Sequence, residues 1–178
     1  MEDGSIKADF KFESYKIDKF SFEMKHYISL LEFAGTFDPS SWKFNLRIAQ
    51  PCYSASRKKY IGGINIEFML MPDMPVNSTE EKKDTGVEQK SIESNLEPLL
   101  KCDVSVVGVF SISESRFEER IEKNLVRLQI PAILLPYGRS TITSFLANAG
   151  FGSAMLPLVN IQKVAQQIVG ELDIQIID

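Results

Sequence analysis

Few side chains in this sequence are suited to catalysis or metal binding. His26 is the only histidine in 178 residues, so a cluster of imidazoles around a metal ion is excluded, and a Ser/His/Asp triad would have to use this one ring. His26 lies beside Tyr27 in a predicted loop, where a surface or packing role is the simpler interpretation. Cys52 and Cys102 could form a disulfide, but two thiols in a chain with no visible secretion signal are more often free.

The other candidates for chemistry also have structural explanations. Cys102 alternates with the valines of a predicted strand, which indicates a buried small hydrophobe rather than a nucleophile. Gly62-Gly63 lacks the helix start and the lysine of a phosphate-binding loop, and predicts a bulge or bend where a strand begins. Glu118, Glu119 and Glu122 are typical of a solvated helix face. We therefore expect a protein that is not an enzyme and that needs neither a metal ion nor a cofactor.

Composition and charge narrow the class of partner. Apolar residues make up 44% of the chain and charged residues 25%, as in ordinary soluble domains. A formal charge of −4 and a pI near 5.2 argue against non-specific binding to nucleic acid or to an anionic membrane. No apolar run approaches the roughly 20 residues of a transmembrane helix, and residues 1–14 lack the basic start and apolar core of a signal peptide. We expect a single cytosolic domain over residues 1–178.

Four stretches of alternating apolar residues predict a sheet. In the first stretch the alternation changes phase twice, which predicts bulges near residues 13–14 and 18–19. The third stretch alternates on one side only, as expected of an antiparallel sheet with one wet face. The predicted strands are the region from Ala8 through Phe22, the stretch from Trp42 that Pro51 stops, Tyr60–Met71 and Leu99–Ser113.

The helices are predicted from caps and from a period of 3.6 residues. Ser115 and Glu118 fit a capping box at the start of one helix. A second helix covers residues 139–149 and ends at Gly150, because a glycine after the last periodic residue accepts the left-handed backbone of a C-cap. Residues 130–136 before it are expected to form a strand-like stretch and a proline turn. The apolar stripe of the second helix consists of Ile142, Phe145, Leu146 and Ala149.

Two further segments complete the predicted chain. Asn160 can cap a last helix that Gly170 closes, and the weak alternation of residues 172–177 fits either a short strand or a helix extension. Residues 73–98 are polar, acidic and rich in turn residues, which predicts a flexible or functional insertion.

Several segments, taken in order, resemble the SecB family of protein-export chaperones. They are the Phe20-Ser21-Phe22-Glu23 strand ending, the strand after Trp42, the run from Cys102 to Ile112, Pro136-Tyr137-Gly138-Arg139, the Gly150-Phe151 break and Leu156-Pro157-Leu158-Val159-Asn160. The resemblance implies an α+β fold, with a four-stranded antiparallel sheet and two long helices packed on one face. It also implies a homo-oligomer, a tetramer in preference to a dimer, with Ile142, Phe145 and Leu146 at the interface.

The resemblance implies a holdase that binds unfolded polypeptides, with protein export as the process it would serve. A client groove is expected at Phe44, Leu46 and Ile48 on the second strand and at Phe151 in the loop after Gly150. Exposed apolar and aromatic side chains suit this role, because they bind extended chains without reading a sequence.

The surface that faces the translocase motor SecA in the family departs from the family pattern. Glu23 and Asp103 occupy two of its acidic positions, but Lys19 stands where another acid is usual. This charge reversal weakens the expected contact with SecA. A different class of function, which stays open, is an adaptor or regulator that uses the SecB scaffold for one dedicated partner such as an antitoxin.

Overall fold

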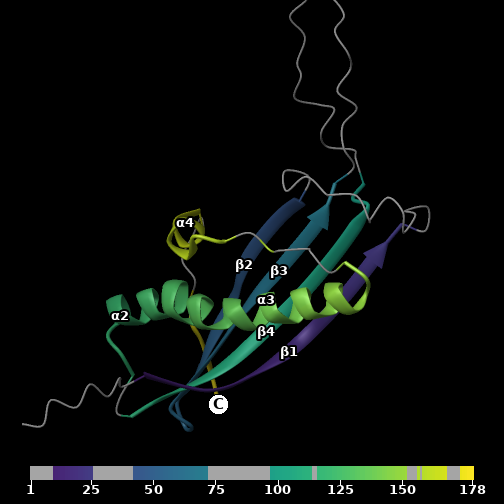
Figure 1. The fold of residues 1–178 in the computed structure, drawn as a ribbon. Helices are drawn as coiled ribbons and strands as arrows, with labels where there is room; N and C mark the ends of the chain where they lie inside the picture. Colours follow the sequence, from purple (N-terminus) through teal and green to yellow (C-terminus); the bar gives the residue numbers. More distant parts are fainter. Residues whose placement is uncertain are drawn as a thin grey trace, which may run out of the picture.

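The computed structural model describes residues 10–25, 42–71, 97–113, 116–151, 156, 158–167 and 173–178. A twisted sheet forms one layer, and a long helix lies across one of its sides (Figure 1). The sheet order is β1-β4-β3-β2-β5, and all neighbours are antiparallel except β2 and β5. The strands are β1 (Phe10–Met24), β2 (Trp42–Ser54), β3 (Lys59–Leu70), β4 (Leu100–Ile112) and β5 (Gln175–Ile177).

The α+β class predicted from the sequence is confirmed, but the predicted number of strands and of long helices is wrong. The sheet has five strands and is mixed, because the C-terminal tail adds β5 parallel to β2. The strand alternative for residues 172–177 is therefore confirmed. Asp178 holds this end in place, since its carboxylate accepts hydrogen bonds from the Ala55 and Ser56 backbone N–H groups at 3.1 and 2.9 Å.

The irregularities of the strands follow the sequence in part. Both predicted bulges of β1 are confirmed, with register shifts between Phe12 and Ser14 and between Ile17 and Lys19. The prediction that Pro51 stops the second strand is wrong. Pro51 falls within a register shift of β2 against β3, between Ala49 and Cys52, where a residue without an N–H costs no ladder hydrogen bond.

One continuous helical stretch replaces the two predicted helices and the strand-like stretch between them. It consists of α2 (Glu119–Asn124), the π-helical segment η3 (Leu125–Gln129) and α3 (Ile130–Asn148). The Ile130 N–H donates to the Leu125 carbonyl five residues back, so the hydrogen-bond register widens directly before Pro131. Pro131 and Pro136 are accommodated because the helix buries a long apolar face on the sheet.

The start of α2 differs from the predicted capping box. The helix begins at Glu119, and its N-cap residue Glu118 makes no side-chain cap hydrogen bond. Ser115 lies outside the described residues, while the residues at 116–118 are not helical. Instead, Arg116 turns toward Glu122, which is buried rather than part of a solvated face.

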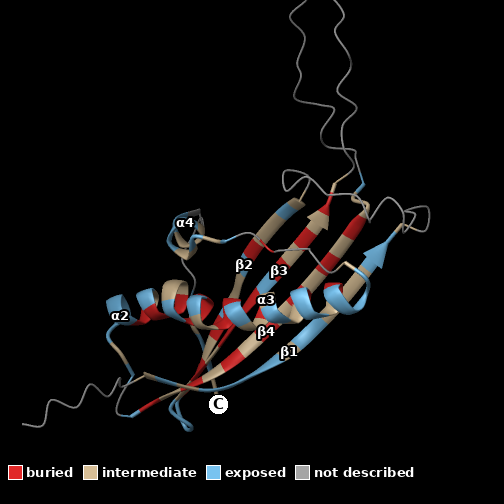
Figure 2. Cartoon of the chain, viewed as in Figure 1, coloured by how far each residue is buried: buried red, intermediate tan, exposed pale blue. Residues whose placement is uncertain are grey.

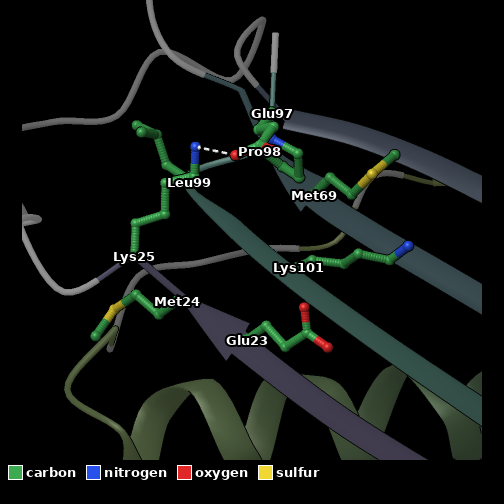
Figure 3. Close-up of a pocket in the computed structure, with 8 residues that line it drawn as sticks. All are labelled: Glu23, Met24, Lys25, Met69, Glu97, Pro98, Leu99 and Lys101. Carbon is green, nitrogen blue, oxygen red and sulfur yellow. Dashed lines mark ion pairs between the residues drawn. The ribbon is translucent and has the colours of Figure 1, made fainter. Parts of the chain in front are cut away.

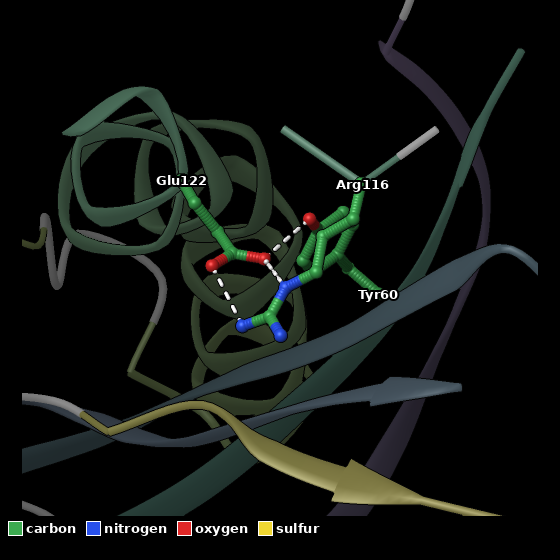
Figure 4. Close-up of polar contacts among 3 residues, drawn as sticks. All are labelled: Tyr60, Arg116 and Glu122. Carbon is green, nitrogen blue, oxygen red and sulfur yellow. Dashed lines mark hydrogen bonds and ion pairs between the residues drawn. The ribbon is translucent and has the colours of Figure 1, made fainter. Parts of the chain in front are cut away.

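A buried polar cluster joins α2 to the sheet (Figure 4). The Tyr60 hydroxyl donates to the Glu122 carboxylate at 2.6 Å, and Arg116 donates to the same carboxylate from Nε at 2.7 Å and from Nη2 at 2.9 Å. Burial and this hydrogen bond together raise the pKa of Tyr60. The three residues, which we call the Glu122 cluster, fix where the long helix begins over β3.

Small residues set how closely the long helix approaches the sheet. A Cβ added at Gly62 would lie 2.7 Å from Ile130 Cγ2, and one at Gly108 would lie 2.7 Å from Leu134 Cδ2. Gly62 pairs with Gly108 of β4 in regular register, so the predicted bulge at Gly62-Gly63 is wrong. The register shift lies instead on the neighbouring strand β2, between Ala49 and Cys52. On the helix, Gly138 faces Ile66 in the same way.

The buried residues form one core between the long helix and the sheet (Figure 2). Burial along β4 alternates strictly, which shows that only one side of the sheet is covered by the helix. Beyond it, α4 (Ile161–Gln167) begins as predicted at Asn160, whose side-chain oxygen accepts from the Lys163 N–H at 3.1 Å. The predicted closing residue Gly170, like the 73–98 insertion up to residue 96, lies outside the described residues.

Candidate functional site

The helix side of the sheet carries half-buried aromatic rings where β1 meets the end of α3. Phe145 of α3 packs on Phe20 and Phe22 of β1, with ring centroids 4.7 and 4.8 Å apart. Phe151 follows the helix and lies 6.3 Å from Phe22. None of these four rings is fully buried. We call Phe20, Phe22, Phe145 and Phe151 the aromatic strip.

A second aromatic cluster lies further along the same margin of the long helix. Tyr15 of β1 stacks on Tyr137 of α3 with centroids 4.0 Å apart, and Phe12 contacts both rings. Tyr15 is 45% exposed. Within the described part of the chain β1 pairs with β4 alone, so the margin that carries both clusters also presents a strand edge.

The structure brings only some of the predicted groove residues together. Phe44, Leu46 and Ile48 share the helix side of β2, but Leu46 is 8% exposed and belongs to the core. Phe22 and Phe44 occupy paired positions on β1 and β2, three strand spacings or about 14 Å apart. Phe151, which contacts Phe22, therefore belongs to the aromatic strip and not to the β2 group.

The loop after Gly150 presents an apolar residue that the groove prediction did not single out. Leu158 is 94% exposed, directly before the last helix. Leu156, two residues earlier, is held close to the long helix, because Arg139 Nη2 donates to the Leu156 carbonyl at 2.8 Å and the Leu156 side chain is buried. The sequence indicated a role for Leu158 only through its position in the loop after Gly150, which was predicted to bind clients.

The residues predicted to lie at an oligomer interface have different positions within the protomer. Ile142 and Leu146 are fully buried between α3 and the sheet, so their side chains are occupied by the core of the same chain. Phe145 is half-buried in the aromatic strip. The exposed face of this part of α3 instead carries Ser140, Thr143 and Ser144.

The outer side of the sheet, opposite the helix, is polar toward one end. The three residues predicted to face SecA all lie on this side: Lys19, Glu23 and Asp103. In the ladder between β1 and β4 they pair with Ser105, Lys101 and Ser21, which are polar and face the same way. Lys101 Nζ lies 2.7 Å from Glu67 and 3.7 Å from Asp103. The ion pair with Lys101 is the main cause that lowers the pKa of Glu67.

A depression of about 440 Å³ lies at the end of the sheet where β1, β3 and β4 meet (Figure 3). Its apolar lining comes from Met24, Met69, Pro98 and Leu99. An ion pair of 2.8 Å joins Lys25 to Glu97 at its rim. The apolar part of this lining suits contact with apolar side chains.

The described residues offer little for covalent or metal chemistry. Burial raises the pKa of Cys102 to about 11, so this thiol is protonated and unreactive at neutral pH. Among these residues no group of three or more His, Cys, Asp or Glu side chains could hold a metal ion, and no helix could cross a membrane. His26 lies outside the described residues. Both cysteines are free.

Comparisons with known proteins agree on one family. The sequence model described as "Preprotein translocase subunit SecB" matches residues 77–171, a range that includes most of the stretch predicted to be an insertion. A "Protein-export protein SecB" of Anaplasma marginale (strain Florida) is 29% identical over 113 residues, which cover 61% of this chain and 64% of that protein. Its namesake in Alkalilimnicola ehrlichii is 36% identical over 66 residues, 37% of this chain and 34% of the relative.

A comparison of folds finds a similar architecture in one solved structure. The Mycobacterium tuberculosis Rv1957 SecB-like chaperone, solved in complex with a ChAD peptide from the Rv1956 HigA1 antitoxin, matches with a TM-score of 0.52. The match covers 85% of this chain and 91% of that chain at 9% sequence identity, so it concerns the fold.

Proposed function

This chain belongs to the SecB family, and from that premise we propose that it is a holdase that binds unfolded polypeptides without chemical modification. The aromatic strip is the observation that carries this proposal, because four half-buried rings follow the free edge of β1. A strand edge offers backbone hydrogen bonds to any extended chain, and aromatic rings bind apolar side chains without selecting a sequence.

Full burial of one large apolar side chain contributes about 1.5–3 kcal/mol, so three such contacts contribute about 4.5–9 kcal/mol. Micromolar affinity requires about 8 kcal/mol after the costs of association and ordering, so a client must make further contacts along the same surface. The client-contacting residues we propose are Phe151 of the aromatic strip, the exposed Leu158, and Phe44 and Ile48 on β2, with Leu46 supporting them from the core.

Substitution of Leu158 tests this surface with little risk to the fold, since its side chain is almost fully exposed. Leu158→Ser is expected to weaken suppression of aggregation of an unfolded client, measured by light scattering at several chaperone ratios. Ile121→Ser is the matched control, because Ile121 is also aliphatic, is 50% exposed, and lies on α2 outside the proposed client-contacting residues. Equal loss in both variants, or none in Leu158→Ser, would contradict the proposed surface.

We propose a homo-oligomer, a tetramer in preference to a dimer, in the cytosol. Support comes from β1, a 15-residue strand at the sheet edge whose backbone groups have no partner on one side among the described residues. Where a second copy pairs with this edge, clients contact the rings of the aromatic strip and not the edge itself. Of the three residues predicted for the interface, Phe145 is the one whose side chain is not fully buried in its own core. A monomer mass by light scattering at micromolar concentration would refute this.

A second candidate function is an adaptor that binds one dedicated partner, with an antitoxin as the example. The fold match to a SecB-like chaperone in complex with an antitoxin peptide favours it. Titration with several unrelated unfolded clients separates the two functions. Similar affinities support the holdase, whereas one tight partner and no general suppression of aggregation support the adaptor. A toxin–antitoxin pair beside the gene would also favour the adaptor.

A further inference from the structure

Four polar residues form a straight row across the outer side of the sheet. The ladder pairs Arg47 with Asn65, Asn65 with Ser105, and Ser105 with Lys19, so the row crosses β2, β3, β4 and β1 in turn. These four residues, which we call the cationic row, line a depression of about 220 Å³ together with Asn45, Glu67, Asp103 and Val104. Arg47, Asn65 and Lys19 are exposed, and Ser105 is half-buried.

The acidic groups near the cationic row form ion pairs with other cations. Glu67 and Asp103 lie in the adjacent row and both pair with Lys101, and Glu67 also accepts a hydrogen bond from Asn45 at 3.4 Å. Asp18, next to Lys19 in the chain, pairs with Lys16 at 2.7 Å.

No such ion pair is available to the two ends of the row. Within the ranges that the structure describes, neither Lys19 nor Arg47 lies within ion-pair distance of a carboxylate, although Arg47 contributes at longer range to the lowered pKa of Glu67. The depression therefore has two unmatched cations at its ends, and between them Asn65 and Ser105 supply an amide and a hydroxyl that can donate hydrogen bonds.

We propose that the cationic row is a docking site for an extended acidic segment of a partner protein, whose Asp or Glu side chains pair with Lys19 and Arg47. The two cations stand about 14 Å apart at their backbones, which is the span of about four residues of extended chain. Carboxylates four residues apart can thus reach both ends, while the donors between them hold the intervening backbone. A basic segment would leave both cations unpaired and would meet carboxylates that Lys101 already occupies.

The cationic row stands apart from the surface proposed for unfolded clients. The aromatic strip lies on the helix side of the sheet and the row lies on the other side, so neither proposal depends on the other. Their failures can be told apart, because binding of the acidic peptide and suppression of aggregation are separate measurements.

The test measures binding of a labelled peptide by fluorescence anisotropy to the full chain at low salt. The probe is a 12-residue Gly/Ser peptide with three Glu side chains at alternate positions, and its counterpart carries Lys at the same positions. The Glu peptide is expected to bind at least about tenfold more tightly, and added salt to weaken it. The double variant Lys19→Gln/Arg47→Gln is expected to lose this preference and to retain suppression of aggregation.

A matched control has the same change of charge on the same side of the sheet. Lys11 and Lys43 are exposed, face outward and lie outside the cationic row, so Lys11→Gln/Lys43→Gln should bind the Glu peptide like the unmodified chain. Equal weakening in both double variants, or no preference for the Glu peptide, would overturn the proposal. Tighter binding of a short single-stranded oligonucleotide than of the Glu peptide would overturn it as well.

Discussion

Removal of Arg116 tests whether the Glu122 cluster holds the start of the long helix to the sheet. The substitution Arg116→Met keeps most of the aliphatic bulk and removes both guanidinium hydrogen bonds to Glu122. Glu122 is 3% exposed, and its carboxylate would then keep only the Tyr60 hydroxyl as a donor.

The magnitude follows from the burial of the two partners. Leaving one member of a buried pair without its partner typically costs about 3–5 kcal/mol. The Arg116 side chain is 39% exposed, which allows water to replace part of the lost interaction and favours the low end of that range. Its contact with the Tyr53 ring, 5.5 Å from the centroid, is lost too and adds about 0.5–1 kcal/mol. We expect a loss of about 3.5–4 kcal/mol in the free energy of unfolding.

Urea unfolding at pH 7.5 measures this loss, and two further variants isolate its cause. Lys123→Met breaks an exposed ion pair with Glu119 in the same helix and should cost at most about 1 kcal/mol. Adding Glu122→Gln to Arg116→Met removes the buried charge but keeps an acceptor for Tyr60, so this double variant should be more stable than Arg116→Met alone. If Arg116→Met costs no more than Lys123→Met, or the double variant is less stable, the reasoning is refuted.

Three further expectations follow. At pH 8 a thiol reagent should modify Cys52 and spare Cys102 in the folded chain. Because burial raises the folded-state pKa of Cys102 to about 11, above the ordinary 9.0, its contribution to stability is complete below about pH 9 and is lost as the pH rises toward 11, which alkaline urea titrations measure. Gly138→Ala should lower the urea midpoint, because the new Cβ would lie 2.3 Å from Ile66 Cδ1, and overpacking of about 1–3 kcal/mol outweighs a gain of up to about 1 kcal/mol in helix propensity. Lys19→Asp should strengthen binding to SecA in a pull-down with purified protein while aggregation suppression stays unchanged, and tight SecA binding by the unmodified chain would contradict the proposed weakening.

The parts of the fold that the sequence predicted are those with local causes. Alternation of side chains located β1 to β4, and the phase changes in β1 located both bulges, because period 2 is a property of each strand alone. The Asn160 cap was likewise predicted from one residue and its neighbours. These features need no knowledge of what the strand or helix packs against.

The long helix was mispredicted because its stability is not local. Proline usually ends a helix, so the sequence predicted a proline turn at Pro136 and a strand-like stretch before it, over residues 130–136. The helix persists because its buried face packs on the sheet, with Gly62 and Gly108 allowing close approach of Ile130 and Leu134. These two contacts join residues about 70 and about 25 positions apart in the chain, and no local sequence pattern predicts such contacts.

The same distinction explains why the sequence predicted a binding surface on each side of the sheet but not the cationic row on the outer side. A single helix layer covers one side of the sheet, so alternate residues of β1 go to surfaces of opposite chemistry: Phe20 and Phe22 to the aromatic strip, Lys19 to the cationic row. The row also depends on the register of three strand pairs, since a one-residue shift in any of them would separate Arg47 from Lys19. Because the sheet lies between the two surfaces, a client on the aromatic strip leaves the cationic row open, and an acidic partner and an unfolded chain can be bound at the same time.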